Sequence, residues 1–176
     1  MDAILTKGQQ RYAAVLRVAF GAIFLAAGIQ KAFLSAKAFT AAGFLKGATD
    51  GTPLLGTPVD GVIYNPTHDF WVALGSNAAV MPFVNWLVVF GQIAIGTALI
   101  LGLGTRFAAA MGALMMAFFL VAAWDFQHGL VNEHLAYLLT TGFIGYIGAG
   151  RYYGLDGVIE KIQVVRRAPQ LRYVLG

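Results

Sequence analysis

The residues with the clearest capacity for chemistry gather in one short stretch of an otherwise apolar sequence. Asp125 and His128 are three residues apart, and His134 and Tyr137 repeat that spacing, which corresponds to one helical turn. Carboxylates, imidazoles and a phenol placed together can accept and deliver protons. We therefore predict that this stretch manages protons. The candidate catalytic residues are Asp125, His128, Glu133, His134 and Tyr137.

A second set of polar residues lies inside apolar segments, where a charge is costly unless it has a partner or a function. Arg17 and Lys31 belong to a row of residues at 4-3-4-3 spacing, so they share one helix face. Gln92 shares a face with Asn85 and falls near the middle of its segment. The alternatives are that Arg17 and Lys31 extend toward the interface and that Gln92 bridges helices. The candidate substrate- or quinone-binding residues are Arg17, Lys31, Gln92, Arg106 and Trp124.

These groups favour a quinone over other redox cofactors. A quinone headgroup needs hydrogen-bond donors at its carbonyls, a titratable group nearby and an apolar slot. The chain has no cysteine, so we expect no iron–sulfur cluster. Its three histidines fall at or outside the outer ends of the apolar segments, so we expect no haem. His128 and His134 supply too few ligands for a zinc site, and without cysteine we expect no metal. The alternative is that residues 125–134 form a solvated loop, with Asn132 as a helix cap.

The composition identifies the environment that must position these residues. Of 176 residues, 59% are hydrophobic and 11% are charged, whereas a typical soluble domain has about 25% charged residues. This excludes an ordinary soluble enzyme and a disordered chain, because neither could carry so much apolar surface. The net charge of +4 comes from basic residues at the ends of apolar segments. We therefore expect a lipid bilayer as partner and no nucleic acid.

Four apolar segments predict an all-α integral membrane four-helix bundle formed by a single domain, residues 1–176. A long outer loop, residues 35–82, holds three prolines and interrupts any further span; its aromatic residues predict short pieces that cap the bundle. Residues 102–105 predict a tight hairpin between the second and third spans. Apolar residues at helical spacing after residue 154 predict an amphipathic interfacial helix within a tail at 151–176. The predicted spans are about 12–34, 83–103, 107–126 and 135–150.

Small residues and basic residues complete the arrangement. Gly142, Gly145 and Gly148 predict the close-contact face of the fourth span, since small residues let helices approach. Lysine and arginine predominate before the first span, in the hairpin at Arg106 and after the fourth span. By the positive-inside rule, both termini are cytoplasmic in a multi-pass protein of the cytoplasmic membrane.

Several motifs resemble those of the DoxX/DoxD family. The resemblance is carried by Arg17…Lys31, by residues 90–96 with 101–106, and by residues 148–156, which read GAGRYYGLD. Residues 42–47, the long outer loop and residues 132–134 are similar to the DoxD-like branch, the membrane subunit of thiosulfate:quinone oxidoreductase. The resemblance covers about residues 11–160 and implies a four-helix membrane bundle. The family's recurrent polar positions correspond here to Arg17, Lys31, Arg106, Arg151 and Asp156.

The resemblance implies a membrane subunit of a quinone-linked oxidoreductase that works with other membrane or periplasmic subunits. One position departs from the family, because Gln92 stands where members often have glutamate. That departure favours an alternative, a non-catalytic accessory or anchoring subunit of a larger respiratory or photosynthetic complex. A small-solute carrier is a weaker alternative, since no internal inverted repeat is evident.

Overall fold

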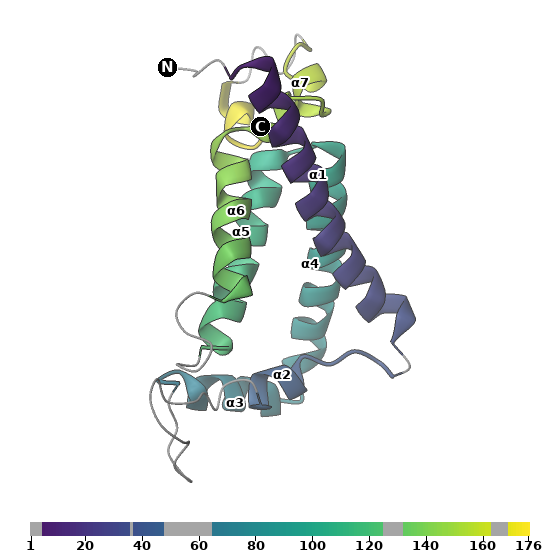
Figure 1. Ribbon diagram of the computed structural model, residues 1–176. Coiled ribbons are helices and arrows are strands. Elements are labelled where there is room, and N and C mark those ends of the chain that lie inside the picture. Colours follow the sequence, from purple (N-terminus) through teal and green to yellow (C-terminus); the bar gives the residue numbers. More distant parts are fainter. Residues whose placement is uncertain (1–4, 36, 48–64, 125–131, 163–168) are drawn as a thin grey trace.

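The computed structural model describes residues 5–35, 37–47, 65–124, 132–162 and 169–176, and the described residues with regular structure are helical. Figure 1 shows the long helices side by side, with short helices across both ends. The elements are α1 (Lys7–Ile29), a π-helical turn (Gln30–Leu34), α2 (Ala42–Gly47), α3 (His68–Ser76), α4 (Met81–Leu101), α5 (Thr105–Ala122), α6 (Glu133–Tyr146), a 3-10 turn (Ala149–Arg151), α7 (Asp156–Ile159) and a second 3-10 turn (Pro169–Tyr173).

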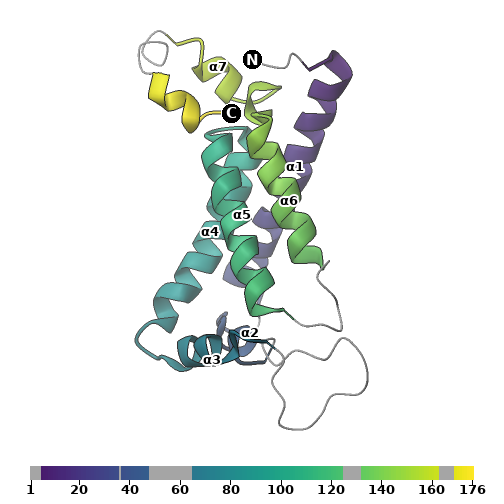
Figure 2. The ribbon, with the colours of Figure 1, turned by 90° about the vertical axis from the view of Figure 1, so that its left-hand side faces the viewer.

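Three of these helical segments are long and apolar enough to cross a membrane: Lys7–Leu34, Met81–Leu101 and Thr105–Ala122. They correspond to the first three predicted spans, shifted by a few residues. The fourth predicted span corresponds to α6, which has 14 residues and runs beside α5. Both described chain ends lie at one end of the bundle, here called the termini end, while α2 and α3 cross the opposite, loop end (Figures 1 and 2).

Local sequence determines where the long helices begin and end. Thr6 and Gln9 form a reciprocal capping box, because each side chain accepts a hydrogen bond from the other's backbone N–H. At the hairpin, Gly102 and Gly104 have φ values of 65° and 59°, a conformation that favours glycine. This confirms the predicted tight connection between α4 and α5. Asn132 caps α6, as the alternative of a solvated loop with a helix cap expects, since its side chain accepts a hydrogen bond from Leu135 N–H at 3.1 Å.

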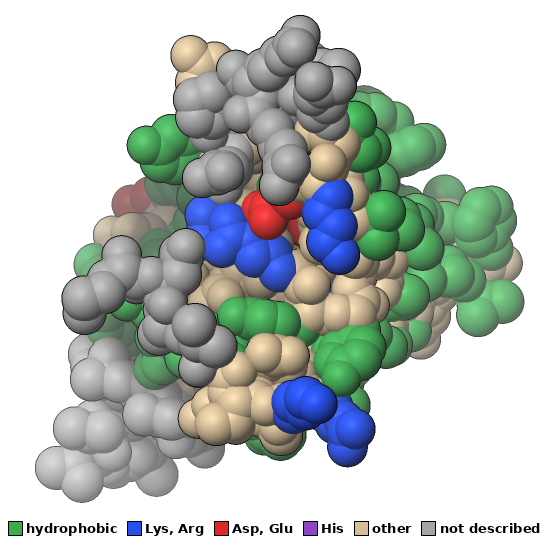
Figure 3. Space-filling model, turned by 90° about the horizontal axis from the view of Figure 1, so that it is seen from above, with side chains coloured by type: hydrophobic (Ala, Val, Ile, Leu, Met, Phe, Trp, Pro, Cys, Tyr) green, Lys and Arg blue, Asp and Glu red, His purple; other side chains and the backbone are tan. Residues whose placement is uncertain are grey.

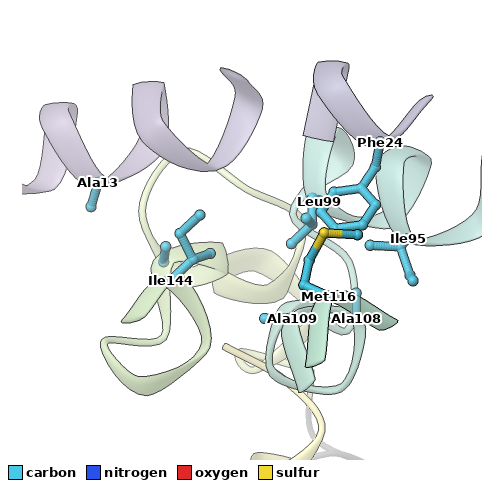
Figure 4. Packing of buried hydrophobic residues seen from close by; sticks show 9 residues of the cluster. Ala13, Phe24, Ile95, Leu99, Ala108, Ala109, Met116 and Ile144 are labelled. Carbon is cyan, nitrogen blue, oxygen red and sulfur yellow. The ribbon is translucent and has the colours of Figure 1, made fainter. Parts of the chain in front are cut away.

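Glycines hold α1 and α4 in backbone contact. A Cβ atom added at Gly21 would lie 2.9 Å from the carbonyl oxygen of Gly96, and one at Gly28 would lie 2.9 Å from the backbone nitrogen of Ile93. Side chains at these positions would separate the helices. The core continues from this contact to α5 and α6, as Figure 4 shows for part of its residues. The buried cluster comprises Ala13, Phe24, Ile95, Leu99, Ala108, Ala109, Met116, Ile144 and Ala149.

The second helix pair, α5 and α6, packs through only part of the predicted glycine stripe. A Cβ atom added at Gly145 would lie 2.9 Å from the Cβ of Ala109, so this residue is a close contact. At Gly142 an added Cβ would meet nothing within 4 Å, so the prediction is wrong for that residue. Each step of three residues turns back about 60° around an α-helix, which carries Gly142 off the face that α5 covers.

The loop end is fastened to the bundle by two asparagines. The buried Asn65 side-chain amide donates hydrogen bonds to the carbonyl oxygens of Val121 and Ala122, at 3.1 and 3.2 Å, and so satisfies the last turn of α5. Asn85 on α4 accepts a hydrogen bond from Ala41 N–H at 2.8 Å. These bonds hold α2 and α3 against the ends of α4 and α5.

The tail differs from the predicted amphipathic helix. Its helix α7 spans only Asp156–Ile159, and Val165, at the end of the predicted apolar pattern, lies outside the described residues. The first residue of α7 is fully buried, and Leu155 and Asp156 donate backbone hydrogen bonds to the carbonyl oxygens of Leu101 and Gly102. The start of the segment is therefore packed against the hairpin.

Candidate functional site

The π-helical turn at the end of α1 places Lys31 in a groove near the loop end. Four residues of this groove come from α4 and the others from the turn and the segment that follows it. Its volume is about 400 Å³, within the size range of small-molecule sites. π-Helical turns interrupt α-helices frequently at functional sites. The groove, here called the Lys31 groove, is lined by Lys31, Ala32, Ser35, Lys37, Ala38, Phe39, Asn85, Trp86, Val89 and Phe90.

Aromatic rings of α4 form one wall of the Lys31 groove. Trp86 and Phe90 are stacked with ring centroids 5.1 Å apart, and Phe83 extends the stack at 6.4 Å from Trp86. Trp86 and Phe90 are each 55% exposed on a helix that is apolar enough to span a membrane. The groove is therefore open toward the lipid phase, and a flat ring entering from the side would meet another ring.

The Lys31 ammonium is held only weakly by its own chain. Its Nζ atom donates a long hydrogen bond of 3.4 Å to the carbonyl oxygen of Ala27 and lies 5.7 Å from the ring centroid of Phe39. Within the part of the chain that the structure describes, no carboxylate forms a salt bridge with it. The ammonium has three N–H donors, so it retains donors for an acceptor placed in the groove.

Gln92, predicted to bind substrate or quinone, lies in the helix interface and does not line the Lys31 groove. Its side chain is 4% exposed and lies beside Gly28 of α1. Its Oε1 atom is buried without a hydrogen-bond partner. Bridging of helices through that oxygen is therefore not observed among the described residues. A buried amide oxygen without a partner costs roughly 1–3 kcal/mol, so this oxygen does not stabilise the interface between α1 and α4.

The predicted residues of α6 lie in a different place. The His134 ring packs against Phe119 of α5, with centroids 5.8 Å apart, and the Tyr137 ring packs edge-on against Phe20 of α1 at 5.7 Å. Glu133 is exposed in the first turn of the helix. Among the described residues, no hydrogen bond or salt bridge joins this set to Lys31.

Three further predicted residues complete this region. Trp124, which follows α5, has a buried indole N–H without a hydrogen-bond partner. Asp125 and His128 lie outside the described residues. The prediction that all these groups share one mouth with Lys31 therefore stays a prediction.

Arg17 lies in the packed interior near the termini end, far along α1 from Lys31. Only 1% of the residue is exposed, so the alternative that it extends to the interface is wrong. Its Nη2 atom donates a hydrogen bond to the carbonyl oxygen of Tyr153 at 3.3 Å, while Nε and Nη1 are buried without partners. Cβ atoms added at Gly102 or Gly154 would overlap Nη1. Glycine at both positions makes room for the guanidinium.

Asp156 completes this buried cluster and is absent from the predicted site. The carboxylate is fully buried and accepts three backbone hydrogen bonds, from Gly104 at 2.7 Å and from Thr105 and Gly176 at 2.9 Å. The first two N–H groups belong to the start of α5, where a negative charge is favourable. The sequence signal for this site was the glycine-rich stretch 148–156. A carboxylate that lies among glycines in a largely apolar chain requires backbone hydrogen-bond partners close by. We call Arg17, Gly102, Gly154 and Asp156 the Arg17–Asp156 cluster.

The surface of the termini end is basic. Figure 3 shows lysine and arginine side chains on both sides of acidic side chains on this face. One pair there is Arg151 and Glu160, whose Nε and Oε1 atoms are 2.9 Å apart and partly exposed. Arg106 lies at the start of α5 and lines a second groove, of about 500 Å³, between α5 and α6. The predicted binding residues are thus divided between the two ends of the bundle.

Comparison with known proteins gives one match. A family model described as DoxX matches residues 12–128, which begin inside α1, extend beyond the end of α5 and include the residues that line the Lys31 groove. Comparisons with curated proteins and with solved structures give no match.

Proposed function

The chain belongs to the DoxX family, a family of membrane proteins, and from that premise we propose that it is the membrane subunit of a quinone-linked oxidoreductase. Electrons would come from a small sulfur anion such as thiosulfate, oxidised with the help of a partner subunit. The observation that carries the proposal is the Lys31 groove, in which a lysine without a carboxylate partner among the described residues faces stacked aromatic rings.

The groove offers what a quinone headgroup requires. The two carbonyl oxygens accept hydrogen bonds, and Lys31 Nζ is a donor among the lining residues, whereas the single O–H of Ser35 is donated to the carbonyl oxygen of Gln30 at 3.1 Å. The ring would pack on Trp86 or Phe90, and the apolar tail would remain in the bilayer beside these exposed side chains. Reduction of a quinone to a quinol takes two electrons and two protons. The ammonium of Lys31 would stabilise the negative charge that develops on the carbonyl oxygen before protonation.

The predicted orientation is consistent with this role. With α6 as a fourth span and the basic termini end in the cytoplasm, the Lys31 groove lies in the outer half of the membrane. An outer partner subunit would then deliver electrons on the same side. In this proposal, protons are exchanged by Asp125, His128, Glu133, His134 and Tyr137, the polar residues of the same half.

Quinone binding to the purified chain tests the proposal. A short-tailed quinone is titrated into the protein in lipid nanodiscs while tryptophan fluorescence is recorded, because Trp86 lines the groove. Lys31→Met keeps the apolar stem and removes the donors. Loss of a hydrogen bond to a charged group costs about 1.5–3 kcal/mol, so we expect a Kd roughly 10- to 100-fold higher.

Lys46→Met is the matched control, since Lys46 is exposed on α2 and does not line the groove. We expect its Kd to equal that of the wild type. The absence of saturable binding to the wild type, or equal Kd values for Lys31→Met and Lys46→Met, would refute the proposal.

A second candidate function is supported by a separate observation. Gln92, in the position where family members often have glutamate, is a buried neutral amide, so it cannot exchange a proton there. That favours an accessory subunit that packs against a larger complex. Native purification distinguishes the two functions. A stoichiometric large complex in which this chain neither holds nor needs quinone supports the accessory role.

A further inference from the structure

The groove between α5 and α6 lies on the opposite half of the bundle from the Lys31 groove, and no part of the proposed quinone chemistry uses it. Its volume is about 500 Å³. Figure 2 shows the two helices side by side along their lengths. The groove is lined by Arg106, Ala110, Gly142, Gly145 and Tyr146.

The floor of this groove is made of residues too small to fill it. Ala110 and Gly142 are exposed, and a Cβ atom added at Gly142 would meet nothing within 4 Å. The space at Gly142 is therefore not needed for contact between α5 and α6, which Gly145 provides. Both helices lie in the apolar part of the chain, so the space is bounded by apolar atoms and opens toward lipid. A methylene chain fits such a space.

The end of the groove nearest the termini end is polar and positively charged. Arg106 is the second residue of α5, and its Nη2 atom would lie 3.4 Å from a Cβ added at Gly148, just beyond the end of α6. Tyr146 is the last residue of α6 and is 83% exposed. Arginine pairs well with phosphate oxygens, and tyrosine is common at the level of lipid headgroups.

We infer that this groove binds one anionic phospholipid, with the headgroup phosphate at Arg106 and Tyr146 and one acyl chain along Ala110 and Gly142. Ala110 is four positions after Arg106, which is about 6 Å along a helix. The charged and apolar parts of the groove therefore follow each other in the order found in a phospholipid. A lipid bound here would strengthen the contact between α5 and α6 from outside.

Lipid retention by the full chain tests this inference. The protein is purified from nanodiscs made of equal parts phosphatidylcholine and phosphatidylglycerol, and the lipids that remain bound in mild detergent are counted by native mass spectrometry. We expect the wild type to retain phosphatidylglycerol about fivefold more than phosphatidylcholine, the effect of roughly one arginine at a membrane surface. Arg106→Gln should lose this preference.

Gly142→Leu provides a test that does not remove a charge. Its side chain enters open space, so we expect the variant to fold with at least wild-type thermal stability and to retain neither lipid. Gly43→Leu is the matched control, because its Cβ also meets nothing within 4 Å and α2 lies outside the groove. Equal lipid retention by Gly142→Leu and Gly43→Leu, or no wild-type preference for phosphatidylglycerol, overturns the inference.

Discussion

Asp156→Asn is the substitution whose effect follows most directly from the structure. The carboxylate is fully buried and accepts three backbone hydrogen bonds, two of them from Gly104 and Thr105 at the start of α5. A carboxamide has the same shape but only one acceptor oxygen, and its NH2 group would face an N–H donor. At least one of the three backbone N–H groups then loses its acceptor, and Arg17 loses its favourable charge interaction with Asp156.

The expected loss of stability follows from the number of backbone N–H donors that lose their acceptor. One buried donor without an acceptor costs about 1–3 kcal/mol, so we expect a loss of about 2 kcal/mol in the free energy of unfolding. For a chain of this size, that corresponds to a Tm lower by about 4–8 °C. Asp156→Ala would leave all three donors unsatisfied at about 3–9 kcal/mol. That loss approaches the whole stability of a typical protein, so asparagine is the more informative substitution.

Thermal unfolding of purified variants in one detergent, followed by circular dichroism, measures this effect. Glu160→Gln is the matched control, since Glu160 is also a carboxylate paired with an arginine at the termini end but is partly exposed. Surface ion pairs contribute about 0–1 kcal/mol, so its Tm should fall by no more than about 4 °C. Equal Tm values for Asp156→Asn and Glu160→Gln would refute the reasoning that burial and three donors make Asp156 special.

Three further substitutions test the packing by the same thermal assay. Gly96→Ala places a methyl group against the backbone of α1 and should lower the free energy of unfolding by about 1–3 kcal/mol. In the control Gly8→Ala, the added methyl group meets nothing within 4 Å and should not destabilise the protein. Equal Tm values for the two variants would contradict the close contact between α1 and α4. Asn65→Ala removes both hydrogen bonds to the end of α5 and should cost about 1–2 kcal/mol, and an unchanged Tm would show that the loop end is not fastened there. Gly102→Ala combines a positive φ with a clash and should lower expression as well as Tm; wild-type behaviour would exclude the tight cradle.

The sequence predicted much of the helical architecture because lipid imposes a simple length and polarity requirement. The first three spans, the hairpin at residues 102–104 and the cap Asn132 follow from local signals and agree with the structure. The prediction that Gly142 lies on the contact face of α6 is wrong, because a repeat of three residues does not stay on one helix face. The tail also differs from the predicted amphipathic helix, because the start of α7 is fixed by the hydrogen bonds that Asp156 accepts from Gly104 and Thr105.

The candidate site was predicted only in part, and the reason is the distance in sequence between its members. Lys31 was identified by its position inside an apolar segment. The stack of Trp86 and Phe90 follows from their spacing of four residues on one helix, but the π-helical turn that places Lys31 opposite them could not be inferred from spacing. Arg17 was identified as an unusual charge, yet its role depends on glycines 85 and 137 positions further along the chain. Side chains brought together by tertiary packing leave no periodic pattern to read.

Photolabelling with a short-tailed quinone tests the central claim, that the Lys31 groove holds a quinone headgroup. The protein in nanodiscs is irradiated with a photoreactive analogue, with and without excess unmodified quinone, and the labelled peptides are identified by mass spectrometry. We predict competed labelling at the residues that line the groove, on Lys31–Phe39 or Asn85–Phe90. Competed labelling only at the other end of the bundle, such as around Arg106, or the absence of competed labelling, would contradict the claim.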